Sequence, residues 1–379
     1  MKIEQSTWRK SKEWITNPPG KLKSAQWVLT FGSREILQEP GHILNIRETY
    51  PDALIVGCST AGEISGARVY DDSLVITAIE FEHTRVKGAQ VQLGNGDMDS
   101  FKAGEELAKA LDHENLAHVL VISEGTHTNG SDLVRGLSKH LPADVAITGG
   151  LAGDGANFEE TVVFFNSGPQ ANSIVVVGFY GDKLQIGYGS MGGWDPFGPE
   201  RLITRSEGNV LFELDDQSAL GLYKNYLGDH AKDLPSSALL FPLSIRSDDY
   251  PEQLVRTILA VDDEAGSMTF AGDVPQGAYA RFMKANFDRL VDGAYGAAKN
   301  SFELGGNESP DLAILISCVG RKLVLQQMVE DEVESVREVL GESTTLTGFY
   351  SYGEICPSAP NANCDLHNQT MTITTISEK

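Results

Sequence analysis

A short glycine-rich pattern, G-x-x-x-x-G-E-I, occurs at residues 57–64 and again at 348–355. A third, more diverged copy lies between them and contains Asp154, which aligns without gaps on Glu63 of the first copy. The three copies stand in the same order of surrounding segments, which favours an internal repeat over chance similarity. The chain is therefore predicted to fold as three similar units.

Apolar runs of strand length come before the helix of each predicted unit and again after its loop. Continuous Val, Ile and Leu runs are typical of strands that are buried on both faces. A strand–helix–strand unit normally gives parallel strands, whereas the more alternating run after each loop can pair antiparallel. We therefore expect an α/β fold of mixed sheets, built from repeated strand–helix–strand–loop–strand units with helices on the sheet faces, in two domains. The runs lie at 26–33, 118–125 and 312–320, and at 73–79, 172–180 and 370–376.

The segment 188–202 is dense in glycine and proline, which indicates a boundary within the chain. From this organisation we expect three parts. They are an N-terminal extension at 1–24, a first domain at 25–215 and a second domain at 216–379.

Composition excludes several classes of protein. The formal net charge of −23 repels phosphate backbones and anionic membranes. The longest apolar runs are far shorter than the roughly 20 residues of a membrane-spanning helix. The first residues, MKIEQSTWRKSKEW, have no apolar core of the signal-peptide type, and four cysteines in 379 residues make no disulfide framework. We expect a soluble cytoplasmic protein that binds no nucleic acid and does not insert into membranes.

Six motifs stand in a fixed order along the chain. They are GCSTAGEI (57–64), GGLAGDG (149–155), LSIRSDDYPEQLVRTILAVDDEAGSMTFAGDVPQG (243–277), SCVGRK (317–322), GFYSYGEI (348–355) and LHNQTMTITTI (366–376). Together they resemble the FIST family, which pairs an N-terminal with a C-terminal FIST domain. The resemblance runs from about Ala25 to about Ile376, and it is specific because six short motifs occur in the right order.

The resemblance implies a role as well as a fold. FIST domains are regarded as sensory modules of signal transduction that bind small ligands, with amino acids among those proposed. Family members are often fused to kinases or chemotaxis modules, but this sequence carries no kinase-type motif. A separate output protein is therefore the expected signalling partner, beside a small-molecule ligand.

The glycine-rich loops are the predicted binding elements. Glycine allows the backbone to approach a ligand closely, and ligands of open α/β sheets bind outside the carboxyl ends of strands. A loop glutamate could accept hydrogen bonds from a ligand ammonium group. The alternative is that the glycines only make tight turns and each glutamate orders its own backbone. The predicted ligand-binding residues are Ser59, Thr60, Glu63, Asp154, Arg246, Arg321, Tyr350, Ser351, Tyr352, Glu354 and Asn368.

The two arginines are predicted as counter-groups for a ligand carboxylate. Arg246 and Arg321 each follow an apolar strand directly, and a guanidinium can hold a carboxylate by two parallel hydrogen bonds. With Glu354 as the acid, either arginine would complete a site for an amino-acid-like ligand. The alternative is an internal salt bridge to Asp248, Asp249 or a loop glutamate.

An alternative class is a hydrolase or transferase that uses Cys58 or Cys356 as nucleophile and His367 as base. A nucleophilic cysteine needs a base within reach and a depressed thiol pKa. Free cysteine is more often a small buried residue, so no catalytic residue is predicted.

No metal or cofactor is predicted. The spacing of Cys356, Cys364 and His367 fits no standard zinc pattern. The glycine-rich segment 149–155 lacks the lysine of a phosphate-binding loop. The segment 124–134 leads from a strand into a helix and could hold an anion there, although His127 alone makes a weak signal.

Overall fold

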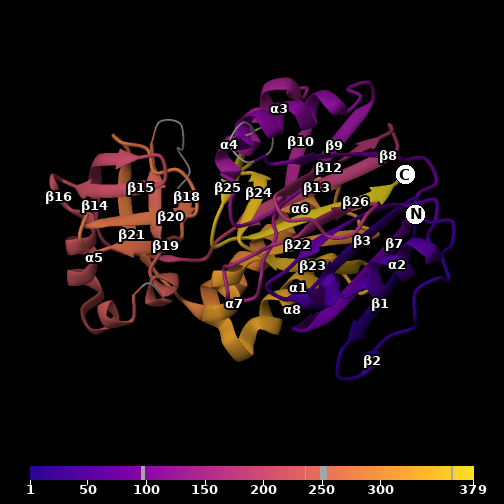
Figure 1. The fold of residues 1–379 in the computed structure, drawn as a ribbon, viewed down its shortest axis with the longest axis horizontal. Coiled ribbons are helices and arrows are strands. Elements are labelled where there is room, and N and C mark those ends of the chain that lie inside the picture. The colour runs from indigo at the N-terminus through magenta and orange to yellow at the C-terminus, as the bar shows by residue number, and fades with distance from the viewer. Residues whose placement is uncertain (95–98, 235, 248–253, 360–361) are drawn as a thin grey trace.

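The computed structural model describes residues 1–379 except 95–98, 235, 248–253 and 360–361. The predicted mixed α/β fold is confirmed. Three sheets of six strands make up one part, and a separate eight-stranded sheet lies beside it (Figure 1). Among the described residues, no helix is long and apolar enough to cross a membrane.

Each of the three units forms the same core of strands. Its first two strands pair in parallel, and its last strand pairs antiparallel with the first. The strand–helix–strand order predicts the parallel pairs, and the more alternating run after each loop predicts the antiparallel strand. The core strands are β3 (Trp27–Gly32), β4 (Leu54–Ser59) and β7 (Ser73–Glu80); β9 (Leu116–Ser123), β10 (Ala146–Leu151) and β12 (Ser173–Tyr180); and β22 (Leu312–Cys318), β23 (Thr345–Ser351) and β26 (Met371–Glu378).

Each unit also has a further strand, which comes before this core in the chain and pairs antiparallel with the last core strand. These strands are β1 (Lys2–Arg9), β8 (Arg85–Gln92) and β13 (Leu184–Met191), and the short β2 (Glu13–Trp14) pairs with β1. The first residues of the chain are therefore part of the first sheet.

The strand that follows each glycine-rich loop joins the sheet of another unit. β5 (Glu63–Ser65) of the first unit pairs with β23 of the third. β24 (Gly353–Pro357) of the third pairs with β10 of the second, and β11 (Val163–Phe165) of the second pairs with β4 of the first. The exchange is cyclic, so the three units form one body. Two short strands, β6 (Arg68–Tyr70) and β25 (Cys364–His367), extend β5 and β24.

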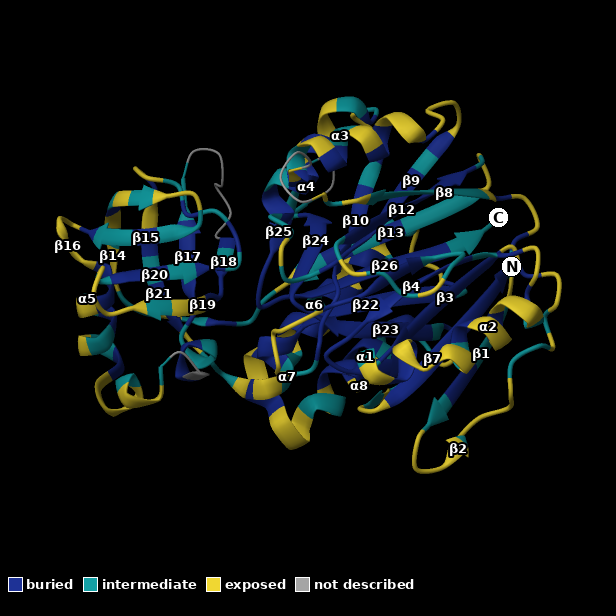
Figure 2. Ribbon diagram, viewed as in Figure 1, coloured by how far each residue is buried: buried dark blue, intermediate teal, exposed yellow. Residues whose placement is uncertain are grey.

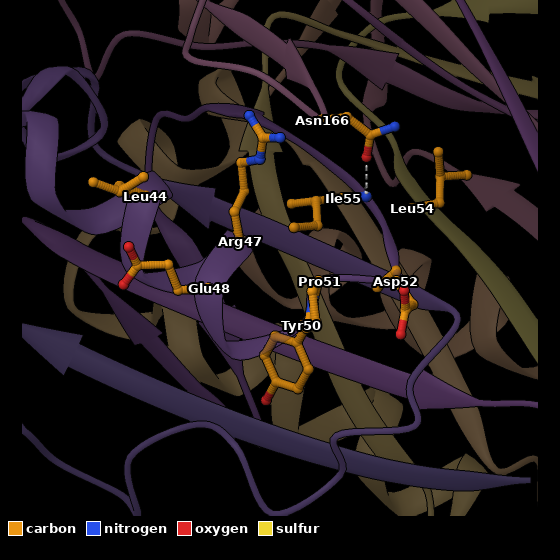
Figure 3. A pocket seen from close by; sticks show the side chains of 10 residues that line it. Leu44, Arg47, Glu48, Tyr50, Pro51, Asp52, Leu54, Ile55 and Asn166 are labelled. Atoms are coloured by element: carbon orange, nitrogen blue, oxygen red, sulfur yellow. Dashed lines mark hydrogen bonds between the residues drawn. The ribbon is translucent and has the colours of Figure 1, made fainter.

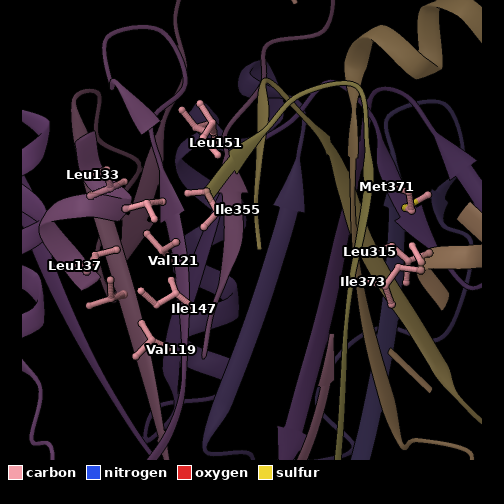
Figure 4. Close-up of a cluster of buried hydrophobic side chains, with 14 of the residues drawn as sticks. Val119, Val121, Leu133, Leu137, Ile147, Leu151, Leu315, Ile355, Met371 and Ile373 are labelled. Atoms are coloured by element: carbon pink, nitrogen blue, oxygen red, sulfur yellow. The ribbon is translucent and has the colours of Figure 1, made fainter. Parts of the chain in front are cut away.

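Helices cover the sheets on the outside, while the strands are mostly buried (Figure 2). In the second unit, Leu133 and Leu137 of a helix pack towards Val119, Val121 and Ile147 of the sheet (Figure 4). The helices are α1 (Arg34–Gln38) and α2 (Pro40–Thr49) in the first unit; α3 (Ser100–Ala110) and α4 (Gly130–His140) in the second; and α6 (Phe287–Leu304), α7 (Val319–Leu325), the 3₁₀ turn η3 (Gln326–Met328) and α8 (Val329–Leu340) in the third.

The eight-stranded sheet is inserted into the third unit, between β13 and α6. We call residues 195–284 the inserted domain and the rest the three-unit body. The expected division at residues 215 and 216 lies in the turn between two strands of this sheet. Its elements are β14 (Asp195–Glu207), β15 (Val210–Leu214), β16 (Gln217–Ser218), α5 (Ala219–Leu227), the 3₁₀ turns η1 (Gly228–Asp233) and η2 (Ser236–Leu240), β17 (Leu243–Arg246), β18 (Leu254–Arg256), β19 (Ile258–Asp262), β20 (Ser267–Phe270) and β21 (Tyr279–Lys284).

The first glycine of each G-x-x-x-x-G-E-I pattern is needed for strand packing. A Cβ on Gly57 would stand 1.9 Å from the carbonyl oxygen of Thr30, and a Cβ on Gly348 would stand 1.8 Å from that of Leu315. Both oxygens belong to the neighbouring parallel strand. The recurring glycine therefore marks a close approach of two backbones.

We predict that Gly57→Ala or Gly348→Ala lowers the free energy of unfolding by roughly 3 kcal/mol or more, because the new methyl group meets backbone that cannot move independently. Gly41→Ala is the control, since a Cβ there meets nothing within 4 Å in the helix α2. Alanine should stabilise that helix by roughly 0.5–1 kcal/mol. Urea unfolding of the three variants measures the effect, and equal stability of Gly57→Ala and wild type would contradict it.

Candidate functional site

The three glycine-rich loops lie together and are joined by backbone hydrogen bonds. The first loop bonds to the second and the third, and the third bonds to the second, so the loops form one cluster rather than three separate turns. The bonds include Ala61 N to Tyr350 O (2.8 Å), Gly153 N to Ser59 O (2.9 Å) and Tyr352 N to Leu151 O (3.2 Å).

Glu63 of the first loop is buried and bonded inside the protein. Its carboxylate accepts hydrogen bonds from the Thr60 hydroxyl and from the Ser73 hydroxyl, the latter at 2.6 Å. The Ser73 backbone N–H donates to the same carboxylate at 3.2 Å. Glu63 thereby ties its loop to the start of β7.

Glu354 of the third loop repeats this arrangement. Its carboxylate accepts from the Ser351 hydroxyl at 2.6 Å and from the Thr370 hydroxyl at 3.0 Å, with the Thr370 N–H at 3.2 Å. Burial raises the pKa of Glu354 to about 8 and the pKa of Glu63 to about 7. These contacts are those of groups that order the loops, and ligand binding by either glutamate stays a prediction.

The two predicted arginines lie apart. Arg321 is fully buried, forms an ion pair with Glu332 at 2.8 Å and also donates to the backbone oxygens of Gly192 and Leu290. Arg246 lies in the inserted domain and forms an ion pair with Glu200 at 3.1 Å. An internal salt bridge, expected as the alternative, is thus present for both, and its partners among the described residues are Glu332 and Glu200.

The remaining predicted residues also lie in the loop cluster or beside it. Asp154 lies 3.3 Å from the Arg34 guanidinium, the Ser59 hydroxyl accepts from a backbone N–H, and the Tyr350 hydroxyl donates to Glu332 at 2.6 Å. Asn368 is buried, and its amide has no hydrogen-bond partner among the described residues. Asp248 and Asp249 lie outside the described residues.

The cysteines are poorly suited to nucleophilic chemistry. Cys58 and Cys356 are fully buried, and burial raises the pKa of both thiols. His367 contacts the backbone oxygen of Cys356 at 2.9 Å, and burial lowers the pKa of its imidazole to about 4. Among the described residues, no group of three or more His, Cys, Asp or Glu side chains is arranged to hold a metal ion.

A cavity of about 910 Å³ lies between the three-unit body and the inserted domain, beside the third glycine-rich loop. We call it the junction cavity. Its lining is largely apolar, with five polar residues. The apolar and small residues are Gly125, Leu151, Ala156, Phe158, Leu239, Ile258, Leu259, Phe270, Ala271, Gly272, Leu323 and Tyr352, and the polar ones are Thr126, His127, Thr128, Asn129 and Asn209.

Two aromatic rings stand side by side in this lining. The rings of Phe158 and Tyr352 stack with their centroids 4.4 Å apart. The Tyr352 hydroxyl accepts from the Phe158 N–H at 3.1 Å and donates to the backbone oxygen of Gly155 at 3.3 Å. The second and third loops are therefore fixed to each other where they meet the cavity, and Tyr352 is the predicted site residue that lines it.

The inserted-domain wall of the cavity was not predicted. The pattern at residues 255–272 indicates a hairpin, and that hairpin forms as β19 and β20. Nothing in its alternation shows that Leu259 and Ala271 border a cavity instead of a core. The segment 124–134, with its weak signal, supplies the polar wall.

A second depression, of about 830 Å³, lies at the N-terminal end of β4 (Figure 3). It is lined by Leu54, Ile55 and the end of α2, where Asn166 accepts from the Ile55 N–H at 2.8 Å. The glycine-rich loop leaves β4 at its opposite end. Ligands of α/β sheets bind outside the carboxyl ends of strands, which favours the junction cavity.

The raised pKa of Glu354 predicts a pH dependence of stability. Between about pH 4.5 and pH 8 the native state keeps a proton that the unfolded chain has released, so stability falls as the pH rises through this window. Glu354→Gln should lose that part of the slope, about 1 kcal/mol or more over the window. Urea unfolding from pH 5 to 8 measures it, with the exposed Glu338→Gln as control. Parallel curves for wild type and Glu354→Gln would refute the assignment.

Sequence comparison identifies the family. The FIST N domain matches residues 26–217, and the FIST C domain matches residues 219–357. An uncharacterized protein of Methanocaldococcus jannaschii is 22% identical over 309 residues, which cover 74% of this chain and 57% of that protein. The chain thus spans little more than half the length of that curated relative.

Among solved structures, a cyanuric acid hydrolase from A. caulinodans aligns over 100% of this chain and 99% of its own, with 8% identity and a TM-score of 0.39. The two domain matches cover most of the chain and meet at residues 217 and 219. The chain therefore belongs to the FIST family.

Proposed function

We propose that this protein is a sensor of signal transduction whose small-molecule ligand binds in the junction cavity. The family is a sensory module for which small-ligand binding is inferred, and the cavity has the size and the apolar lining of a ligand site. The observation that carries the proposal is the position of this cavity. Two separately packed parts of the chain and the third glycine-rich loop meet there.

The contacts beside the cavity suggest how a ligand acts. Arg256 of the inserted domain is buried and donates to the backbone oxygen of Leu366 in the body at 2.7 Å. Asn129 donates to Asp273 of the inserted domain at 3.1 Å. A ligand between these contacts adds interactions with both parts, so it favours one arrangement of the inserted domain over others. A separate output protein would read that arrangement.

The ligand is proposed to be a small metabolite, with amino acids among those to be tested, and the setting cytoplasmic. The pair of Glu354 with an arginine, expected to hold an amino acid, does not line the cavity. An amino acid would therefore depend on the loop 125–129 and on its own apolar side chain. A thermal-shift screen over metabolites identifies the ligand, because a molecule that binds the native state raises its melting temperature.

The cysteine-dependent enzyme is the less favoured alternative, and it makes a distinct prediction. Burial with a raised thiol pKa should make Cys58 and Cys356 react slowly with iodoacetamide at pH 7. Mass spectrometry of the native protein should show them unlabelled after a time that fully labels the urea-unfolded chain. Rapid native labelling of either residue would favour the enzyme.

Filling the cavity tests the proposal directly. Ala271→Trp places a large ring in the cavity and should weaken binding of the screened ligand by roughly tenfold or more, because the ring occupies its volume. Ala260→Trp is the matched control, as Ala260 is exposed in the same hairpin and does not line the cavity. Calorimetry measures both affinities. Unchanged affinity in Ala271→Trp, with both variants folded, would place the ligand elsewhere.

A further inference from the structure

The polar wall of the junction cavity is built around a buried carboxylate. Glu124 is 1% exposed, and it accepts from the backbone N–H groups of Thr126 and His127 at 3.0 and 2.9 Å. It also accepts from the Thr126 hydroxyl at 3.0 Å and from the Thr128 hydroxyl at 2.7 Å. These bonds shape the loop that faces the cavity.

Those contacts decide what the two hydroxyls can still do. A threonine hydroxyl has one proton to donate and two lone pairs to accept with. Thr128 gives its proton to Glu124 and already accepts from the Ser123 hydroxyl at 2.8 Å, so one lone pair is left for a ligand donor. The Thr126 hydroxyl lies 3.0 Å from Glu124 and 3.0 Å from Nδ1 of His127, and while its proton is on the bond to Glu124 it can only accept from a ligand. The wall therefore favours a ligand that donates hydrogen bonds.

The carboxylate of Glu124 behind the wall also favours a ligand group that donates hydrogen bonds. Among the described residues, no lysine or arginine forms an ion pair with Glu124, whose one ionisable partner is the exposed His127 at 3.5 Å. The described lining of the cavity contains no Lys, Arg, Asp or Glu. The N-terminus of α4 also points here, but Asn129 caps it and Asp132 lies in its first turn. Beside Gly272, on the opposite wall, lies the buried Arg256, which donates to the backbone oxygens of Asp273 and Leu366. On the Glu124 side of the cavity, a positive ligand group is thus favoured over a negative one.

At the contact between the first and third units, and at the contact between the first and second units, a lysine or arginine of the chain itself bonds to the neighbouring unit. Lys322 donates to the backbone oxygen of Ala61 at 2.7 Å and pairs with Asp71. Arg34 lies 3.3 Å from Asp154. Both cations come from the helix that follows a unit's first strand. In the second unit, the loop 124–129, which contains no lysine or arginine, and the junction cavity take that position.

We propose that the junction cavity binds an amine whose body is apolar. The ammonium group donates to the hydroxyls of Thr126 and Thr128, with Glu124 as the charge behind them. The body packs on Leu259, Phe270 and the stacked rings of Phe158 and Tyr352, whose faces also attract cations. This inference rests on the proposed function and names the chemical class of its ligand.

Three probes of matched size separate charge from shape: 2-phenylethylamine, 2-phenylethanol and 3-phenylpropionate. Calorimetry at low salt should show the amine binding roughly tenfold or more tightly than the alcohol, and the acid most weakly. Equal binding of amine and alcohol, tighter binding of the acid, or no binding by any probe would overturn the amine assignment. This comparison uses the unmodified protein, so it needs no variant to fold.

Variants then locate the amine. Glu124→Gln should reduce the preference for amine over alcohol by roughly tenfold, whereas the exposed Glu342→Gln should leave it unchanged. An unaltered preference in folded Glu124→Gln would refute the role of this carboxylate. Ala271→Trp should abolish amine binding; if it does not, the amine binds elsewhere. If Ala271→Trp still blocks a ligand from the metabolite screen, the sensor proposal stands although the amine assignment has failed.

Discussion

Backbone hydrogen bonds between strands of different units hold the three-unit body together. β5, β24 and β11 each leave their own unit at the glycine-rich loop and complete the sheet of another. A unit on its own would lack one strand of its sheet and would leave its crossing strand unpaired, and unpaired backbone groups are costly when buried. Each crossing therefore has to take place at a fixed position, and this requirement accounts for the conformation of the loops.

The buried carboxylates fix that position. Glu63 and Glu354 are the first and second residues of their crossing strands, and each accepts hydrogen bonds at the start of its unit's last strand, from Ser73 at the first residue of β7 and from Thr370 just before β26. One side chain thus links the strand that leaves the unit to the strand that returns to it. Burying a carboxyl group in this way raises its pKa, so a perturbed carboxyl here reflects the construction of the fold and does not by itself indicate catalysis.

The three units could be predicted from the sequence, but the strand pairing between different units could not. Repetition and apolar runs are local properties, so the parallel strand pairs and the loops could be predicted from them. Pairing of β5 with β23 joins residues almost three hundred positions apart, and no local pattern encodes it. The same limit applies to the site. Tyr352 was predicted because it lies in a loop, whereas Ala271 borders the cavity only because the inserted domain folds back against the body.

The position of the inserted domain in the chain places the cavity next to the strand that crosses from the third unit to the second. The domain interrupts the third unit, and it is the loop of this unit that crosses to the second. The cavity therefore lies between the inserted domain and a crossing whose geometry Glu354 already fixes. Arg256 bonds to Leu366 in β25, which pairs with the crossing strand β24. Because that strand is paired on both sides in the sheet, the proposed ligand would change the placement of the inserted domain more easily than that of the body.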